Sequence, residues 1–374
     1  MKRQWMLPGM VMGVLAAAPA FSAEDVGAVL KRYNIQEQPT PVRQNPLWRK
    51  PAKVLLLDYG LHPGASERVR AVVGSTNLVV VNDSRSAATA AVDADVIIGA
   101  NPEICDGRIV NNAKQVRWLA SLSAGVENCM NLPAVTARSL MLTNMRGVDS
   151  PVIAEHAIGM MLALAHGLEK FAVDTSQGIW PRGSKGGMPI QYMGGKTLLI
   201  SGLGGIGNEI ARRAHALDMK VVATRVGGTG KPDYVSYVGQ PDELLTLART
   251  ADVIISAVPL TPETTDLYNK EFFAVLKPTA FFINTARGGS VDTDALVAAL
   301  NEKRLAGAGL DVTDPEPLPP GHPLWKAPRV LITPHVGGRS DVTDDARWTV
   351  ALENLRRYIA GEKMLNVVDL ALGF

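Results

Sequence analysis

Short apolar runs recur along most of the chain, separated by segments whose spacing is compatible with helices. The runs are rich in Val, Ile and Leu and lack the polar alternation of a strand with one face in water. Such runs are typical of parallel strands buried on both faces, and strands that alternate with helices predict doubly wound α/β sheets. The runs fall at 53–60, 78–83, 95–100, 116–122 and 140–144, and again at 196–201, 220–224, 251–258, 280–286, 306–312 and 330–334.

The two series of runs indicate two α/β domains with a cleft between them. A long helical segment at 151–176, with Pro151 in its first turn, follows the first series. We predict one domain over 53–149 and a second over 150–338. The last helix has no strand of its own to cover, so we expect residues 339–374 to fold back and complete the first domain.

The N-terminus has a different character. Lys2 and Arg3 precede an apolar run and then small residues, which is the three-part layout of a secretory signal peptide. We predict a signal peptide at 1–23 and an N-terminal extension at 24–52. If the signal is functional, we expect the protein to be exported to the periplasm. If it is not, we expect the protein to stay in the cytoplasm. The apolar run is short for a bilayer span, so we expect no stable membrane span after processing.

Composition narrows the class of protein. The chain has 374 residues, of which 47% are hydrophobic and 20% charged, as in an ordinary globular protein with two cores. A net charge of +2 gives no reason to expect a nucleic acid as partner.

Cys105 and Cys129 each follow a predicted strand, and one disulfide would suit an oxidising compartment. Nothing in the sequence pairs them, so we expect two unpaired thiols.

A glycine-rich turn follows the first strand of the second series. Gly202, Gly204 and Gly207 have G-x-G-x-x-G spacing, and a helix and another strand come after them. In this context Gly202 permits the tight turn, Gly204 lets a pyrophosphate approach the backbone, and Gly207 lets helix and strand pack closely. A purely structural turn is the alternative. We therefore interpret 150–338 as an NAD(P)-binding Rossmann domain and 53–149 as a flavodoxin-like substrate domain.

Arg225 lies at the end of the second strand, 18 residues after Gly207. An acid at this place accepts hydrogen bonds from the ribose 2′-hydroxyl of NAD, whereas an arginine can pair with the 2′-phosphate of NADP. Lys231 is a second candidate cation. We expect NADP to be preferred, with NAD possible. The alternative is that Arg225 stacks on the adenine or is solvated.

Arg287, Glu316 and His335 each follow a predicted strand of the second series. They therefore lie beyond the carboxyl ends of parallel strands, where open α/β sheets bind ligands. A histidine exchanges protons near neutral pH, a carboxylate can hold its ring, and an arginine offers a fork to a substrate carboxylate. Beside a dinucleotide turn, this set favours catalysis.

The chain contains the motifs "SAGVE" (123–127), "TNMRGVDSPVIAEHAIGMMLAL" (143–164), "GLGGIG" (202–207), "VPLTPETTDL" (258–267), "INTARGGSVD" (283–292), "GLDVTDPEPL" (309–318) and "TPHVGG" (333–338). Through these motifs, from about residue 53 to residue 368, it resembles the D-isomer-specific 2-hydroxyacid dehydrogenase family. The resemblance implies that Arg287 binds the substrate carboxylate and carbonyl, and that Glu316 supports His335 as general acid/base. It also implies a homodimer that associates through the cofactor domains.

The resemblance places further residues in the site. Backbone amides of the loop Ser123, Ala124, Gly125 and Val126 would face the substrate carboxylate, and Asp311 would lie near the nicotinamide edge. The residues implied at the cofactor are Gly202, Gly204, Gly205, Ile206, Gly207, Arg225, Val258, Pro259, Thr285, Ala286, Arg287, Asp311 and His335. No metal is expected.

We predict an oxidoreductase that transfers a hydride between NAD(P)H and a small 2-keto acid or D-2-hydroxy acid. An arginine at position 225, in place of the acid of NAD-using members, resembles the NADP-preferring glyoxylate and hydroxypyruvate reductases. A signal peptide, in contrast, is foreign to this mostly cytosolic family. A non-catalytic NADP-dependent sensor or interaction module of the same fold is the alternative. Among sister enzymes, Glu316 disfavours formate dehydrogenase, and phosphite oxidation stays open.

Overall fold

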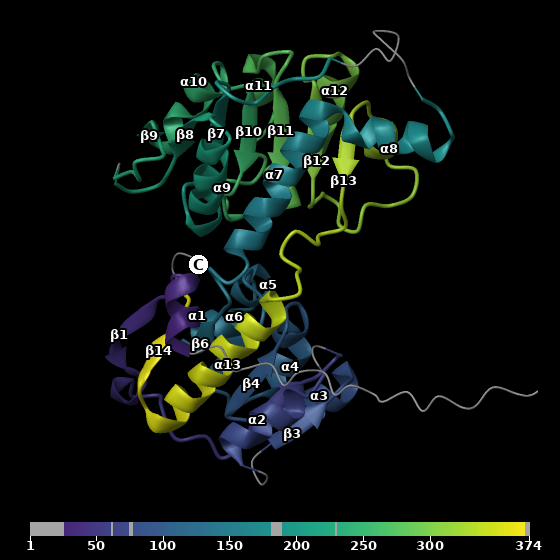
Figure 1. Cartoon of the computed structure of the whole chain (residues 1–374). Coiled ribbons are helices and arrows are strands. Elements are labelled where there is room, and N and C mark those ends of the chain that lie inside the picture. The colour runs from purple at the N-terminus through teal and green to yellow at the C-terminus, as the bar shows by residue number, and fades with distance from the viewer. Residues whose placement is uncertain (1–25, 61–62, 75–77, 181–188, 229, 371–374) are drawn as a thin grey trace, which may run out of the picture.

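The computed structural model describes residues 26–60, 63–74, 78–180, 189–228 and 230–370, which form two lobes, each built on a parallel sheet (Figure 1). The predicted signal peptide at 1–23 lies outside the described residues. The two parallel sheets with their helices confirm the predicted α/β class.

The smaller lobe has a five-stranded parallel sheet in the order β3-β2-β4-β5-β6, which is the flavodoxin-like order. Neighbouring residues of β2 point to opposite faces: Leu56 packs under α13 (Thr343–Ala360), α1 (Val26–Arg32) and α2, whereas Leu55 packs against α3 and α4. The strands are β2 (Val54–Leu57), β3 (Leu78–Val81), β4 (Val96–Gly99), β5 (Trp118–Ser121) and β6 (Met141–Thr143). The helices are α2 (Ala65–Val73), α3 (Ser84–Ala90), α4 (Gly107–Asn112), α5 (Glu127–Met130) and α6 (Pro133–Ala137).

The larger lobe has a seven-stranded parallel sheet in the order β13-β12-β11-β10-β7-β8-β9. Its strand order reverses between β7 and β10, which is where open α/β sheets bind ligands. The strands are β7 (Thr197–Ser201), β8 (Lys220–Thr224), β9 (Tyr237–Gly239), β10 (Val253–Ser256), β11 (Phe281–Asn284), β12 (Gly307–Leu310) and β13 (Val330–Ile332). One face is covered by α7 (Ser150–His166) and α9 (Gly205–Ala216), and the other by α10 (Leu244–Ala248), α11 (Lys270–Val275) and α12 (Thr293–Asn301). Short 3-10 helices are η1 (Val42–Gln44), η2 (Glu103–Cys105), η4 (Pro241–Glu243), η5 (Gly288–Ser290) and η6 (Pro323–Lys326).

Both chain ends of the described structure lie on the smaller lobe. The C-terminal helix α13 (Thr343–Ala360) packs against α1 (Val26–Arg32) and α2, and Tyr358 of α13 stacks on Trp118 of β5. β1 (Glu37–Pro41) pairs antiparallel with β14 (Lys363–Leu365). The segment we expected to be an extension therefore contributes Val29 and Tyr33 to the core of this lobe.

The predicted helix at 151–176 is two helices. α7 ends at Gly167, whose φ of +68° is left-handed and suits a glycine, and α8 (Leu168–Ser176) follows at an angle of 70°. In the part of the chain that the structure describes, no single helix is long and apolar enough to cross a membrane, and only the bent pair α7 and α8 passes that test together.

Two segments cross between the lobes, and an ion pair joins them. Asp149, just before α7, lies 2.8 Å from Nη2 of Arg347 in α13, and the same guanidinium donates to the carbonyl of Gly338. Burial raises the pKa of Asp149, and the guanidinium of Arg347 opposes that rise. The pair therefore ties the outgoing chain to the returning chain at the junction of the lobes.

Cys105 and Cys129 form a disulfide, so the expectation of two unpaired thiols is wrong. Cys105 ends η2 after β4, and Cys129 lies in α5 after β5. β4 and β5 are parallel neighbours, so the segments at their carboxyl ends meet and bring the two Cα atoms to 4.7 Å. Closing a loop of this length stabilises the fold by about 3 kcal/mol in the chain-entropy account.

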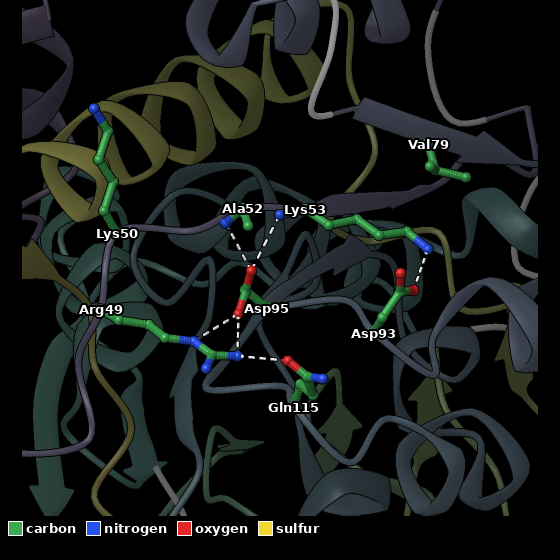
Figure 2. Close-up of a pocket in the computed structure, with 8 residues that line it drawn as sticks. All are labelled: Arg49, Lys50, Ala52, Lys53, Val79, Asp93, Asp95 and Gln115. Carbon is green, nitrogen blue, oxygen red and sulfur yellow. Dashed lines mark hydrogen bonds and ion pairs between the residues drawn. The ribbon is translucent and has the colours of Figure 1, made fainter.

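A pocket at the amino-terminal edge of the smaller sheet is lined by charged side chains, among which Arg49 pairs with Asp95 and Lys53 with Asp93 (Figure 2). Asp95, just before β4, is almost fully buried. Its carboxylate accepts hydrogen bonds from Arg49 Nε (2.8 Å) and from the amides of Ala52 (2.7 Å) and Lys53 (3.1 Å). Asp95 thus fastens the incoming chain to the amino-terminal edge of the smaller sheet.

Replacing Asp95 by alanine is expected to lower the free energy of unfolding by about 2–4 kcal/mol, because two backbone amides lose their acceptor. Urea unfolding measures the loss. Asp93→Ala is the matched control, because its carboxylate is 63% exposed and, among the described residues, pairs with Lys53 at the surface, so its removal should change the free energy of unfolding far less. Equal losses in the two variants would contradict this assignment.

Candidate active site

The glycine turn after β7 has the geometry of a dinucleotide cradle. Gly202 has a φ of +98°, and a Cβ there would lie 2.7 Å from the carbonyl oxygen of Ala257. A Cβ on Gly207 would lie 2.2 Å from the carbonyl oxygen of Gly202, so helix α9 packs on the turn only with glycine. Beside Gly204, at the start of α9, the space is open. A pyrophosphate fits that space against the helix N-terminus.

Other residues predicted at the cofactor lie around this turn. A Cβ on Gly202 would lie 3.1 Å from Val258 Cγ1, so Val258 and the adjoining Pro259 flank the turn. Gly205 faces the hydroxyl of Ser150, and Ile206 packs into the core between α7 and α9.

Thr285 and Ala286 follow β11 at the same sheet edge and are buried. The Thr285 hydroxyl has no hydrogen-bond partner within the described residues, although it is buried. A buried polar atom of this kind calls for a partner. Together with the glycine cradle, it fits a bound nicotinamide dinucleotide.

Arg225 follows β8 but its side chain turns back onto its own loop. Its guanidinium donates to the carbonyl oxygens of Gly228 (2.6 Å from Nη2) and Gly230 (2.7 Å). Lys231, the second candidate cation, donates to the carbonyl of Val235 (2.8 Å). The guanidinium is partly exposed and is hydrogen-bonded only to carbonyl oxygens, with no acid paired to it among the described residues.

Arg287, Glu316 and His335 follow three neighbouring strands. β11, β12 and β13 are parallel and in register, so the loops after them emerge side by side. A Cβ on Gly288 would lie 1.9 Å from the carbonyl oxygen of Thr313, so the turn after Arg287 touches the loop that carries Glu316. The predicted set is therefore assembled at one edge of the larger sheet.

His335 and Glu316 are in direct contact, with 2.6 Å between Nδ1 and Oε1. A carboxylate accepts a hydrogen bond, so Nδ1 carries the proton and Nε2 is left for a reacting group. The two side chains are half-exposed. His335 has a φ of +52°, a left-handed conformation that a histidine adopts only when its surroundings enforce it.

Asp311 enforces that conformation. Its buried carboxylate accepts hydrogen bonds from the amides of Val336 (2.9 Å) and Gly337 (2.8 Å) and from the Thr333 hydroxyl (2.6 Å). His156 of α7 reaches the same hydroxyl through Nε2, at 2.9 Å. The structure thus uses Asp311 to hold the loop of His335, a role that the resemblance did not provide. His156 lies within the motif at 143–164, but the sequence does not predict its contact with Thr333.

Arg287 contacts the smaller lobe. Its Nε donates to Glu127 Oε1 (2.8 Å), and its Nη1 donates to the carbonyl of Ala286 (2.7 Å). A Cβ on Gly125 would lie 1.9 Å from Nη2, so the guanidinium rests on the backbone of that glycine. Sequence reasoning missed Glu127, although it closes the quoted motif "SAGVE".

The loop against which Arg287 rests has free amides. The carbonyls of Ala124 and Gly125 accept from the side chains of Asn144 (2.8 Å) and Asn101 (3.2 Å). Among the described residues, the amides of Ala124, Gly125 and Val126 donate to no protein group. Ser123 differs, because its amide donates to the Ser121 hydroxyl (3.1 Å). Three amides beside an arginine can bind a carboxylate.

A dinucleotide cradle with a histidine–carboxylate pair and an arginine at the same sheet edge defines a nicotinamide-dependent oxidoreductase. Residues 158–337 match the family model of the D-isomer specific 2-hydroxyacid dehydrogenase NAD-binding domain. Glyoxylate reductase of Thermococcus litoralis is 31% identical over 282 residues, which are 74% of this chain and 84% of that protein. The chain belongs to the D-isomer specific 2-hydroxyacid dehydrogenase family, and it is an NAD(P)-dependent enzyme that acts on CH–OH donors.

Solved structures agree with this membership. A crystal structure of a protein from Thermus thermophilus is 33% identical, with a TM-score of 0.73, and the match covers 85% of this chain and all of that one (100%). A D-isomer specific 2-hydroxyacid dehydrogenase from Xanthobacter autotrophicus, solved in complex with NADPH and MES, is 25% identical with a TM-score of 0.71 and covers 87% of this chain and 100% of its own.

Proposed function

We propose that this enzyme reduces small 2-keto acids such as glyoxylate with NADPH, and that Arg287, Glu316 and His335 carry the reaction. The observation that supports it most is the 2.6 Å contact between His335 and Glu316 on the sheet edge that also carries the glycine cradle. The similarity to glyoxylate reductases supports the substrate class.

The nicotinamide, when bound, supplies the hydride that reaches C2 of the keto acid. His335, held by Glu316 through Nδ1, donates a proton from Nε2 to the carbonyl oxygen. Arg287 and the free amides of Ala124, Gly125 and Val126 bind the carboxylate and fix its orientation. In the reverse direction His335 accepts the proton of a D-2-hydroxy acid.

A substrate panel tests the proposal. Glyoxylate, hydroxypyruvate, pyruvate, bulkier keto acids and phosphite are assayed with each form of the cofactor, following the nicotinamide absorbance. We expect turnover of small keto acids, faster with NADPH than with NADH. Cofactor binding without turnover of any keto acid would favour the non-catalytic sensor. Reduction of NADP⁺ by phosphite, with no keto acid turned over, would favour a phosphite dehydrogenase.

We propose that the protein is exported. The signal-like residues 1–23 and the disulfide between Cys105 and Cys129 support this, because disulfides persist in oxidising compartments. Cell fractionation followed by intact-mass analysis tests it. An exported chain is shortened at its N-terminus and carries no free thiol, whereas a full-length cytoplasmic chain with two reactive thiols would contradict the proposal.

We also propose a homodimer formed through the cofactor domains. Helix α8 buries none of its residues, and Trp180 shortly after it is 78% exposed. Exposed apolar side chains of this kind mark interaction surfaces. Light scattering tests the assembly: a mass equal to one chain of 39.9 kDa or less would refute it.

A further inference from the structure

Glu127 is the one acid of the smaller lobe that is paired with a catalytic candidate of the larger lobe within the described residues. It begins α5, directly after the loop with free amides. Its carboxylate accepts from Arg287 Nε at 2.8 Å, and both side chains are 31% exposed. The pair therefore forms where the two lobes meet, partly shielded from solvent.

The pair constrains the orientation of the guanidinium. An arginine offers five N–H donors in a planar fork. Glu127 takes the Nε donor and the carbonyl of Ala286 takes one Nη1 donor, while Nη2 rests on Gly125. The plane of the guanidinium is thereby fixed, and Nη2 lies beside Gly125, within the loop that carries the free amides.

Glu127 is itself held in place. Cys129, two residues further along α5, is joined by the disulfide to Cys105 in η2. The side-chain amide of Asn101, two residues after β4, also donates to the carbonyl of Gly125. The acid is thus fixed to the smaller lobe from two sides, and rotation of Arg287 away from the loop costs this ion pair.

We propose that Glu127 is a positioning residue, which orients Arg287 so that its outer donors and the free amides together grip the substrate carboxylate. The inference rests on the proposed function. It predicts a role in substrate capture through Arg287, with no contact between Glu127 and the cofactor turn. The opposite hypothesis is that Glu127 competes with the substrate carboxylate for Arg287.

Three variants test this proposal. Glu127→Ala is expected to raise KM for the keto acid about tenfold or more with a smaller change in kcat, because a misoriented arginine binds the carboxylate poorly. Glu127→Gln keeps the shape and an acceptor oxygen, so it should restore part of the affinity. Glu302→Gln is the matched control, since Glu302 accepts from Arg304 Nε at 2.7 Å on the surface and should leave KM unchanged.

Binding of oxamate, an unreactive keto-acid analogue, provides a readout without turnover. Calorimetric titration of the NADPH-saturated proteins should show about tenfold weaker oxamate binding in Glu127→Ala and about equal NADPH binding in all variants. Unchanged or tighter oxamate binding in Glu127→Ala overturns the positioning role, and tighter binding identifies competition. If the wild type neither binds oxamate nor reduces any keto acid, the proposed function fails as well.

The Glu127→Gln variant keeps the test valid if Glu127→Ala folds poorly. Thermal unfolding of each variant identifies that case. A Gln variant that melts with the wild type but binds oxamate as tightly as the wild type would contradict the proposal, because a neutral amide should orient Arg287 less well than the carboxylate does.

Discussion

Replacing His335 by alanine is expected to reduce kcat for keto-acid reduction by about 100- to 10,000-fold. The variant lacks the group that delivers a proton to the developing alkoxide, and water is a poorer donor at neutral pH. Glu316 then has no ring to hold, although Asp311 still holds the loop backbone through the amides of Val336 and Gly337. The loss should therefore be chemical, with the site otherwise assembled.

Two measurements separate this effect from a general defect. The dissociation constant for NADPH, followed by fluorescence, should change by less than about threefold, because the glycine cradle lies on other strands. His215→Ala removes an exposed histidine from the last turn of α9 and should leave the rate unchanged. Keto-acid reduction at the normal rate by the His335 variant would eliminate it as the acid/base.

The two parallel sheets and the loops of the candidate catalytic residues could be predicted from the sequence, because both follow from local patterns. Buried strands need uninterrupted apolar runs, and Arg287, Glu316 and His335 directly or closely follow such runs. The carboxyl ends of neighbouring parallel strands lie together. The sequence therefore predicts that His335 and Glu316 lie near each other, although it does not give the distance between them.

The features that the sequence did not reveal depend on contacts between distant segments. β1 contains two prolines and pairs with β14 more than 300 residues away, so no local strand pattern marks it. The same holds for the disulfide, whose partners meet only because β4 and β5 are neighbours. The sequence around Glu127 and Asp311 does not show which groups their carboxylates bind. Only the fold shows that Glu127 pairs with Arg287 and that Asp311 holds the loop of His335.

Arg225 is the second position where we expect a large effect. If Arg225 binds the 2′-phosphate as we propose, replacing it by aspartate should lower kcat/KM with NADPH about 100-fold, because a charge-assisted pair would be lost and a repulsive charge would take its place. With NADH the aspartate can accept hydrogen bonds from the ribose hydroxyl, so kcat/KM should stay level or rise. Steady-state kinetics with both cofactors gives the ratio.

This test also distinguishes a structural role, because the Arg225 guanidinium donates hydrogen bonds to the carbonyls of Gly228 and Gly230 in its own loop. If that is its only role, the substitution loosens the loop and both cofactors lose affinity together. A fall in the NADPH value alone would show that the guanidinium also binds the phosphate, and its Nη1 donates to neither of those carbonyls. Lys220→Asp makes the same change of charge at the opposite, exposed end of β8, so an unaltered ratio in that variant excludes a long-range effect of charge.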